Sequence, residues 1–307
     1  MKRTRSAVAV WLPLLVALAA VAGLALLLTD RDDNADLDAL QRSATTVGDS
    51  GAAPKPGQLP DTPDYHSLLV AESNSRRIFL GTHAGLFVTD DGGLTWNQGE
   101  LVDRDAMNLV QAPGKTLWSA GHNVLVKSMD GGETWTEADP TGLPHLDVHG
   151  FAADPVRPER LYAAIAGQGL FRSTDGGESF GLVSEEVGGA VFGLAVTPSG
   201  SILAADASRG VFVSEDGGKT WTQTLDNPAL GIAVNPRDSK VVLAAGPLGV
   251  FRSTSGGKSW DLVLPFAEGA GPLAWSPSEP RVAYAIGFDK SLYRSDDLGA
   301  TWAPVTS

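Results

Sequence analysis

Short apolar runs and turn residues alternate with one period through most of this chain. From residue 65 onward, an apolar run ends near a proline (GLAVTPSG, 193–200), a second follows (ILAAD, 202–206) and a third precedes a Gly-rich turn (GVFVS, 210–214). An aromatic residue after that turn opens a fourth run. Runs of this length, separated by Gly, Pro, Asn and Asp, are typical of strands. The pattern predicts an all-β domain built from four-stranded units.

The Gly-rich turn recurs six times and sets the number of units. Its copies are Thr89–Trp96, Ser128–Trp135, Ser173–Phe180, Ser214–Trp221, Ser253–Trp260 and Ser295–Trp302, whose first residues are 39, 45, 41, 39 and 42 positions apart. A period near 40 residues is the length of one four-stranded propeller blade. The spacing therefore predicts a six-bladed β-propeller over residues 65–307. Since no strand is left over to be exchanged, we expect packing between the first and last blades to close the ring.

The repeated turn resembles the Asp-box, S-x-D-x-G-x-T-W, which implies a tight hairpin with a structural role. The expected structural residues are the carboxylates, which accept backbone N–H bonds, and the aromatic side chains, which wedge between blades: Asp91, Asp130, Asp175, Asp216, Trp96, Trp135, Trp221, Trp260 and Trp302. Box five has Ser255 where the aspartate is expected, and box six has Leu298 in place of the first glycine. We expect these two hairpins to be looser than the others.

The N-terminus predicts export. Lys2, Arg3 and Arg5 precede an uncharged run that is long enough for a membrane-spanning helix over residues 7–29. Residues 1–29 are consistent either with a retained signal anchor or with a signal peptide cleaved after Ala22. The apolar run continues beyond Ala22, which favours the anchor. Residues 30–64, rich in Ser, Thr, Gly, Pro and Ala, predict a flexible stalk. We expect the propeller to lie outside the cytoplasm of a bacterial cell, anchored in the envelope or secreted if cleaved.

Composition narrows the possible chemistry. The chain has no cysteine and a formal net charge of −13. Disulfides, thiol nucleophiles and zinc–cysteine sites are therefore excluded, and the acidic balance argues against a nucleic-acid partner. Any metal ion must be held by histidine, methionine or carboxylate side chains.

Four of the five histidines fall at equivalent positions of the first three blades. When the blades are aligned on their second strands, His83 matches His122, whereas His66 matches His149. Both positions lie on the rim opposite the Asp-boxes, where propellers usually bind ligands. The predicted ligand-binding residues are these four histidines, the methionine at the matching position of blade two, and a neighbouring carboxylate: His66, His83, Met107, His122, Asp147 and His149.

Three interpretations of this histidine-rich rim remain open. His66, His83, His122 and His149 could hold a transition metal, copper if a thioether joins them or zinc if a carboxylate does. They could instead line a polar ligand pocket, or simply fill the channel. The rim also carries acid/base candidates for hydrolysis, of which Asp147 is a weak catalytic candidate: Asp103, Asp105, Asp147, Glu185, Glu186, Asp206, Asp226, Glu268 and Asp289.

The Asp-boxes resemble those of sialidases, sortilin-type receptors and photosystem assembly factors. The F-R-I-P segment of sialidases and the Cys-rich module of sortilin-type receptors are both missing. The chain is also similar to bacterial exported Asp-box proteins labelled glycosyl hydrolase-like, through His66–Leu68, Thr82–Phe87, Ser119–His122 and Asp147–His149. That label is based on the propeller fold and gives little information about chemistry. We expect non-catalytic binding of a ligand, metal, glycan or protein partner at the rim, the alternative being a sialidase-like glycoside hydrolase.

Overall fold

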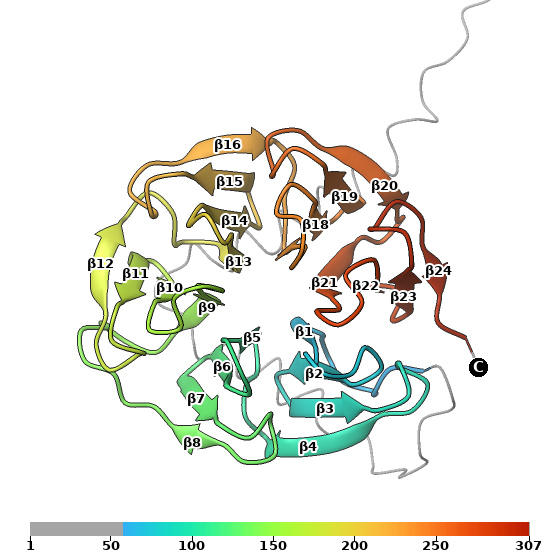
Figure 1. Ribbon diagram of the computed structural model, residues 1–307, viewed down its shortest axis with the longest axis horizontal. Coiled ribbons are helices and arrows are strands. Elements are labelled where there is room, and N and C mark those ends of the chain that lie inside the picture. Colours follow the sequence, from blue (N-terminus) through green and yellow to red (C-terminus); the bar gives the residue numbers. More distant parts are fainter. Residues whose placement is uncertain (1–57, 307) are drawn as a thin grey trace, which may run out of the picture. The chain divides into compact units, whose positions relative to one another are not determined.

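A computed structural model describes residues 58–306, which form six four-stranded antiparallel sheets arranged as a ring (Figure 1). The first two blades are β1 (Ser67–Val70), β2 (Ile78–Thr82), β3 (Gly85–Thr89), β4 (Asn97–Val102), and β5 (Asn108–Gln111), β6 (Leu117–Gly121), β7 (Val124–Ser128), β8 (Thr136–Glu137). The next two are β9 (Val148–Ala153), β10 (Leu161–Ile165), β11 (Gly169–Ser173), β12 (Gly181–Ser184), and β13 (Val191–Val196), β14 (Ile202–Asp206), β15 (Gly210–Ser214), β16 (Thr222–Leu225). The last two are β17 (Gly231–Val234), β18 (Val242–Gly246), β19 (Gly249–Ser253), β20 (Asp261–Pro265), and β21 (Ala270–Trp275), β22 (Ala283–Gly287), β23 (Leu292–Ser295), β24 (Ala303–Pro304). The predicted all-β, six-bladed propeller is confirmed.

The expected membrane segment, residues 7–29, lies outside the described residues. Within residues 58–306 no helix has the length and apolar character needed to span a membrane.

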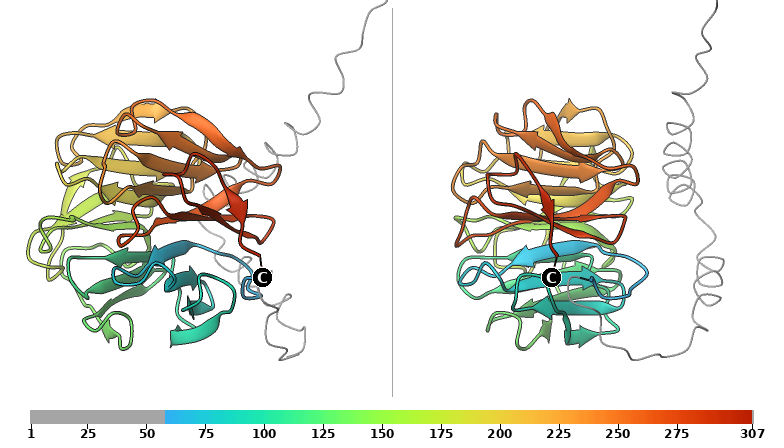
Figure 2. Two further views of the ribbon diagram at one scale, coloured as in Figure 1. Left: turned by 45° about the vertical axis from the view of Figure 1, so that its right-hand side comes forward. Right: turned by 90° about the vertical axis from the view of Figure 1, so that its right-hand side faces the viewer.

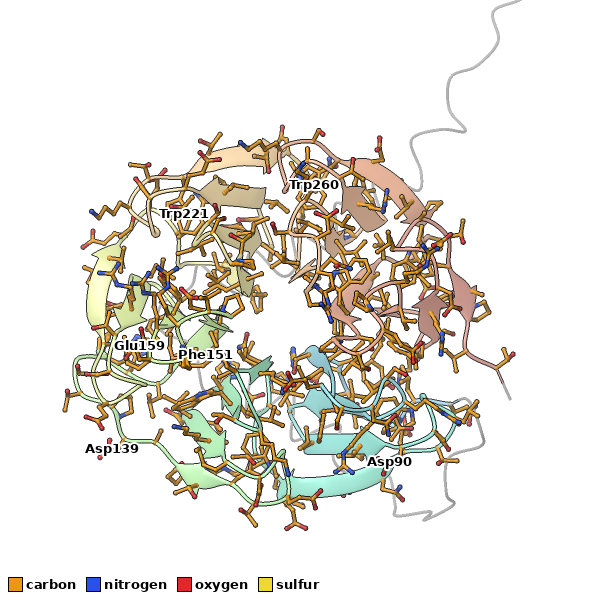
Figure 3. All side chains as sticks on the ribbon, in the orientation of Figure 1. Asp90, Asp139, Phe151, Glu159, Trp221 and Trp260 are labelled. Carbon is orange, nitrogen blue, oxygen red and sulfur yellow. The ribbon has the colours of Figure 1, made fainter. Side chains whose placement is uncertain are left out.

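Each blade is held by its second strand and by an aromatic wedge. The second strand of every blade is buried along its whole length. The aromatic residue of each Asp-box packs into the apolar cluster of the preceding blade. Trp221 contacts the cluster around Leu170 of blade three, and Trp260 contacts that around Leu203 of blade four (Figure 3). The wedge role predicted for these aromatic residues is therefore seen in the packing.

The same wedge closes the ring. Trp96 of blade one lies in one cluster with Leu292 of blade six, and Leu59, ahead of the first strand, is buried in that cluster. Tyr284 of blade six donates a hydrogen bond to the carbonyl of Ser75 in blade one, 3.4 Å away. Each described sheet contains four consecutive strands, so no strand is exchanged between blades. Residues 58–64, which we had assigned to the stalk, therefore pack against the propeller instead.

The Asp-box hairpins share one hydrogen-bond pattern. Asp91 accepts backbone N–H bonds from Leu94 and Thr95, both at 2.9 Å, and a hydroxyl bond from Thr95 at 2.6 Å. Box six keeps this pattern through Asp297, because Leu298 adopts the left-handed conformation (φ 66°) that glycine takes elsewhere. The expectation that box six is looser is thus wrong for its hydrogen bonds. Box five is reduced, since the single Ser255 hydroxyl accepts only the Ser259 N–H.

Strand register fixes the two rims of the propeller, seen edge-on in Figure 2. In blade one, Ser67 pairs with Gly81 and Thr82 pairs with Gly85, so the start of β1 and the β2–β3 turn share one rim. The Asp-box after β3 lies on the other rim. We call the first rim the turn rim, because it carries the six turns at residues 83–84, 122–123, 166–168, 207–209, 247–248 and 288–291.

Candidate functional site

Histidines and aspartates alternate along the turn rim of blades one to three. We call this set the His–Asp array: Asp64, His66, His83, Asp105, His122, Asp147 and His149. Consecutive imidazole rings stack or meet edge to face, with centroids 4.2 Å apart for His66 and His83, 5.7 Å for His83 and His122, and 5.5 Å for His122 and His149. The array is therefore continuous across three blades.

The array is built from one motif that blades one and two share. An aspartate stands three residues before the first strand, and a histidine directly follows the second strand. Antiparallel pairing brings the two together. In blade two, Asp105 Oδ2 accepts the backbone N–H of His122 at 2.9 Å and contacts its Nδ1 at 2.6 Å. In blade one, Asp64 accepts the His83 N–H at 3.1 Å and contacts the His83 Nδ1 atom.

Blade three breaks this motif and leaves a carboxylate without its partner. The position after its second strand is occupied by Ala166, so Asp147 has no histidine from its own turn. Its Oδ1 atom instead lies 3.4 Å from Nε2 of His122 and 3.1 Å from Nε2 of His149. This oxygen is buried and has no aligned hydrogen bond, and the same holds for Nδ1 of His149. The His149 ring stacks on Phe192, with centroids 4.9 Å apart.

Pairing within the array shifts the pKa of five of its members, three carboxyls and two imidazoles. Burial disfavours ionisation of Asp64 and of Asp105, but hydrogen bonds from the imidazoles outweigh it and lower the pKa of both carboxyls. The contact with His149, opposed by burial, lowers the pKa of Asp147. Conversely, the hydrogen bond that Asp64 accepts raises the pKa of His83 against the effect of burial, and Asp105 does the same for His122.

The array contains three groups that could hold a metal ion. They are Asp64 with His66 and His83, Asp105 with His83 and His122, and Asp147 with His122 and His149, each with ligand atoms within 4.8 Å of one another. Adjacent groups share a histidine, so they cannot all be filled independently.

The structure brings five of the six predicted ligand-binding residues into the array, and the sixth, Met107, lines the central cavity together with His66. Sequence reasoning missed Asp64, which it placed in the stalk, and treated Asp105 only as a possible acid. A signal was present, because Asp64-x-His66, Asp105-x-Met107 and Asp147-x-His149 repeat the same spacing.

The other predicted acids of blades four to six lie outside the array. Asp206 forms an ion pair with Arg209 at 2.8 Å. Asp289 accepts the hydroxyl of Tyr293 at 2.8 Å. These carboxylates serve local turns and do not converge on the histidines.

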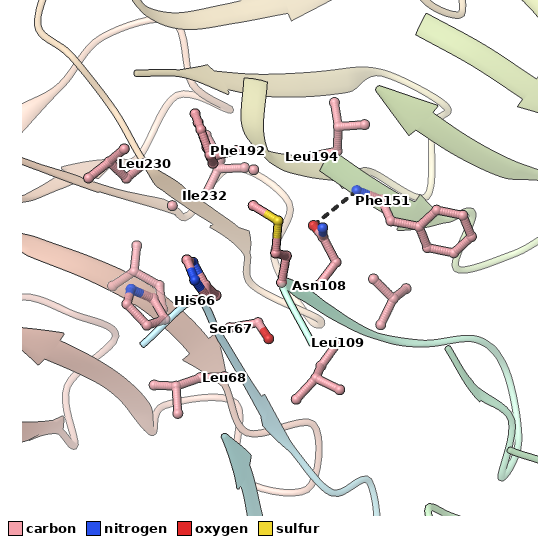
Figure 4. A pocket seen from close by; sticks show the side chains of 16 residues that line it. His66, Ser67, Leu68, Asn108, Leu109, Phe151, Phe192, Leu194, Leu230 and Ile232 are labelled. Atoms are coloured by element: carbon pink, nitrogen blue, oxygen red, sulfur yellow. Dashed lines mark hydrogen bonds between the residues drawn. The ribbon is translucent and has the colours of Figure 1, made fainter. Parts of the chain in front are cut away.

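The central cavity beside the array is small. It has a volume of about 80 Å³ and is lined by His66, Asn108, Phe192 and residues of the other three blades (Figure 4). Asn108 crosses between blades, donating to the His149 carbonyl at 3.2 Å and accepting the Phe151 N–H at 3.1 Å. A cavity of this size holds roughly five waters, whereas pockets for organic ligands measure about 300 Å³ or more.

Comparison with known proteins identifies the family. The family described as photosynthesis system II assembly factor YCF48 matches residues 67–306. The chain belongs to this family. Of the resemblances suggested by the Asp-boxes, the match selects the photosystem assembly factors, and it does not extend to sialidases or sortilin-type receptors.

Relatives of the YCF48-family propeller include an assembly lipoprotein and xyloglucanases. The photosystem II assembly lipoprotein Ycf48 of a Synechococcus species is 24% identical over 243 residues, which cover 74% of this chain and 71% of the relative. A probable oligoxyloglucan-reducing end-specific xyloglucanase of Neosartorya fischeri is 30% identical over 231 residues, which cover 72% of this chain and 23% of the enzyme. The chain thus spans less than a quarter of that enzyme's length.

Solved structures show the same fold. A structure of YCF48 bound to D1 peptide matches with a TM-score of 0.52 and 22% identity, covering 82% of this chain and 86% of that chain. The GH74 xyloglucanase from Xanthomonas campestris matches with a TM-score of 0.56 and 18% identity, covering 83% of this chain and 46% of that chain.

Proposed function

We propose that this propeller is a non-catalytic binding protein that captures a protein partner on its turn rim. The observation that carries the proposal is the engagement of the central rim carboxylates. Asp64, Asp105 and Asp147 each contact imidazole nitrogens, and each has a lowered pKa. A glycoside hydrolase needs a carboxylic acid that stays protonated beside a second carboxylate. The lowered pKa values of these three carboxyls do not suit the acid role.

The turn rim combines the polar array with two exposed apolar side chains, a mixture that protein interfaces also show. Phe288 occupies the position in blade six that His83 and His122 occupy in their blades, and it is 43% exposed. Leu248, in the turn of blade five, is 39% exposed. The two turns meet at Gly269, where an added Cβ would lie 2.9 Å from Pro247 and 3.0 Å from Phe288. The YCF48 relative bound to D1 peptide supports a protein segment as the class of partner, with His66, His83, His122, Asp147 and His149 as its polar contacts.

We further propose that the partner is met outside the cytoplasm. The relative named as an assembly lipoprotein and the xyloglucanases support an extracytoplasmic location. Since the 307 residues contain no cysteine to carry a lipid, residues 7–29 are the proposed means of export and attachment to the envelope.

Site-specific photocrosslinking in the source cells tests the binding role. A photoreactive phenylalanine replaces Phe288 on the turn rim, and in a control replaces Met129, which is exposed on the Asp-box rim. We expect a discrete crosslinked protein from position 288 only. Equal products from both positions, or none, would contradict the proposal.

A hydrolysis screen tests the enzymatic alternative. The full chain is incubated with xyloglucan oligosaccharides and sialosides, beside the Asp147→Asn variant. We expect no turnover from either protein. Turnover that Asp147→Asn abolishes would establish the glycoside hydrolase instead.

A further inference from the structure

The orphaned carboxylate of blade three identifies a specific metal site within the array. We propose that His122, Asp147 and His149 bind one divalent transition-metal ion, with Zn²⁺ as the best match. The ligand atoms are Nε2 of both histidines and Oδ1 of Asp147.

Donor spacing favours this group over its neighbours. In a tetrahedral zinc site with bonds of about 2.0–2.1 Å, ligand atoms lie about 3.3–3.4 Å apart. Oδ1 of Asp147 lies 3.4 Å and 3.1 Å from the two Nε2 atoms. In the middle group, the distances from the Asp105 oxygens to the imidazoles of His83 and His122 are 3.9 Å and 2.6 Å, one too long and the other too short.

The first group is already satisfied without a metal. Nε2 of His66 and Nδ1 of His83 are hydrogen-bonded at 2.9 Å, and Asp64 contacts both rings. An ion there must replace these bonds. At the proposed site Oδ1 of Asp147 is buried and makes no aligned hydrogen bond, so coordination would satisfy it. Oδ1 of Asp105 in the middle group is unpaired in the same way, so the two groups are distinguished by donor spacing alone.

A second carboxylate prepares His122 for coordination. Asp105 Oδ2 holds Nδ1 of His122 at 2.6 Å, which places the proton on that nitrogen and leaves the Nε2 lone pair directed at the site. Carboxylate–histidine–metal chains of this kind fix the tautomer and orient the ligand. Asp105 is thus a positioning residue, and His149 is fixed in a different way, by burial and by stacking on Phe192.

The donor set selects the metal and leaves a position open. Two imidazoles and a carboxylate suit zinc and iron(II), and the tetrahedral spacing of the donor atoms described above favours zinc. Three protein ligands complete only part of a tetrahedron. The fourth position faces the rim, because 45% of the His122 side chain and 38% of the Asp147 side chain are exposed.

Zinc titration of the full chain tests the assignment. Protein stripped with a chelator is titrated with ZnCl₂ by calorimetry, and bound metal is measured by mass spectrometry after desalting. We expect one Zn²⁺ per chain, lost in Asp147→Asn and in His149→Gln but retained in His66→Gln, the equivalent position of blade one. Asp105→Asn should weaken binding by about 10–100-fold without abolishing it.

The melting temperature of each metal-free variant shows whether it is folded. If His149→Gln is unfolded, Asp147→Asn still tests the site, because Asp147 is partly exposed. The absence of stoichiometric zinc in the wild-type chain would overturn the proposal. So would loss of zinc in His66→Gln with retention in Asp147→Asn. Either result leaves the crosslinking test at residue 288 unaffected, so the metal site and the partner-binding role can fail separately.

Discussion

Repairing Asp-box five should stabilise the propeller. In the intact boxes one carboxylate accepts two backbone N–H groups and a hydroxyl, as Asp91 does from Leu94 and Thr95. Ser255 accepts one backbone N–H, from Ser259 at 2.9 Å, and its hydroxyl shares a bond with that of Ser259 at 2.8 Å. Ser255→Asp therefore adds an acceptor for the N–H of Lys258 and makes the existing bonds charge-assisted.

The size of the gain follows from these bonds. A neutral hydrogen bond contributes about 0.5–1.5 kcal/mol and one to a charged group about 1.5–3 kcal/mol, figures that must be reduced at a solvent-exposed turn. We expect a net stabilisation of about 1 kcal/mol. For a domain of this size that raises the melting temperature by roughly 2–4 °C. The reverse change in an intact box, Asp91→Ser, should lower it.

The gain should depend on pH in a defined direction. Although partial burial opposes ionisation, hydrogen bonds led by that from Thr95 lower the pKa of Asp91 to about 2, from an ordinary value of 3.8. A carboxyl whose pKa is lower in the folded state stabilises it above pH 4, and this contribution disappears as the pH falls toward 2. Differential scanning calorimetry of wild type and Ser255→Asp at pH 7 and at steps below pH 4 measures both effects. An unchanged melting temperature at pH 7, or a gain that persists undiminished to pH 2, would refute this reasoning.

Two further changes test the array and the ring closure. Asp64→Asn should lower the raised pKa of His83, because it removes the charged partner while the amide oxygen can still accept the His83 N–H. NMR titration of the ring protons measures this pKa, and an unchanged value would contradict the prediction. Gly93→Ala should lower the free energy of unfolding in urea by about 2–4 kcal/mol, because the residue has φ 96° and its new methyl would overlap Leu292 across the blade one–six junction. Gly131→Ala is the control. It has φ 85° and open space around it, so it should lower the free energy of unfolding by only about 1–2 kcal/mol. Equal costs for the two glycines would show that the junction yields to the methyl group.

The fold could be predicted because its determinants are local and repeated. Each Asp-box hairpin is specified by a few neighbouring residues, and the spacing between boxes gives the blade length without any long-range information. Even the departure at Leu298 is absorbed locally, by a left-handed residue that preserves the bonds of Asp297. The end of the stalk was misjudged because residues 58–64 are rich in proline and polar side chains, and their packing depends on the distant Leu292 cluster.

The site could be predicted only in part, because its chemistry depends on distances between blades. Alignment placed His83 with His122 and His66 with His149, but it gave no separation between neighbouring positions. Whether a carboxylate pairs within its own blade or reaches the next depends on the twist and spacing of the sheets. The sequence alone therefore leaves the metal site as one of three interpretations, and the contacts of Asp147 are what motivate the proposal of zinc.

Departures from the repeat, more than the repeat itself, give this rim its proposed chemistry. In blades one and two, an aspartate and a histidine of the same blade satisfy each other, as Asp105 and His122 do. Replacement of the third histidine by Ala166 leaves the next aspartate facing imidazoles of two blades, which is the arrangement a metal ion requires. Further around the ring the same position becomes Phe288, and the rim turns from polar to apolar. A single repeated scaffold thus presents two different surfaces to a partner, because the residues at one turn position vary while the strands beneath them do not.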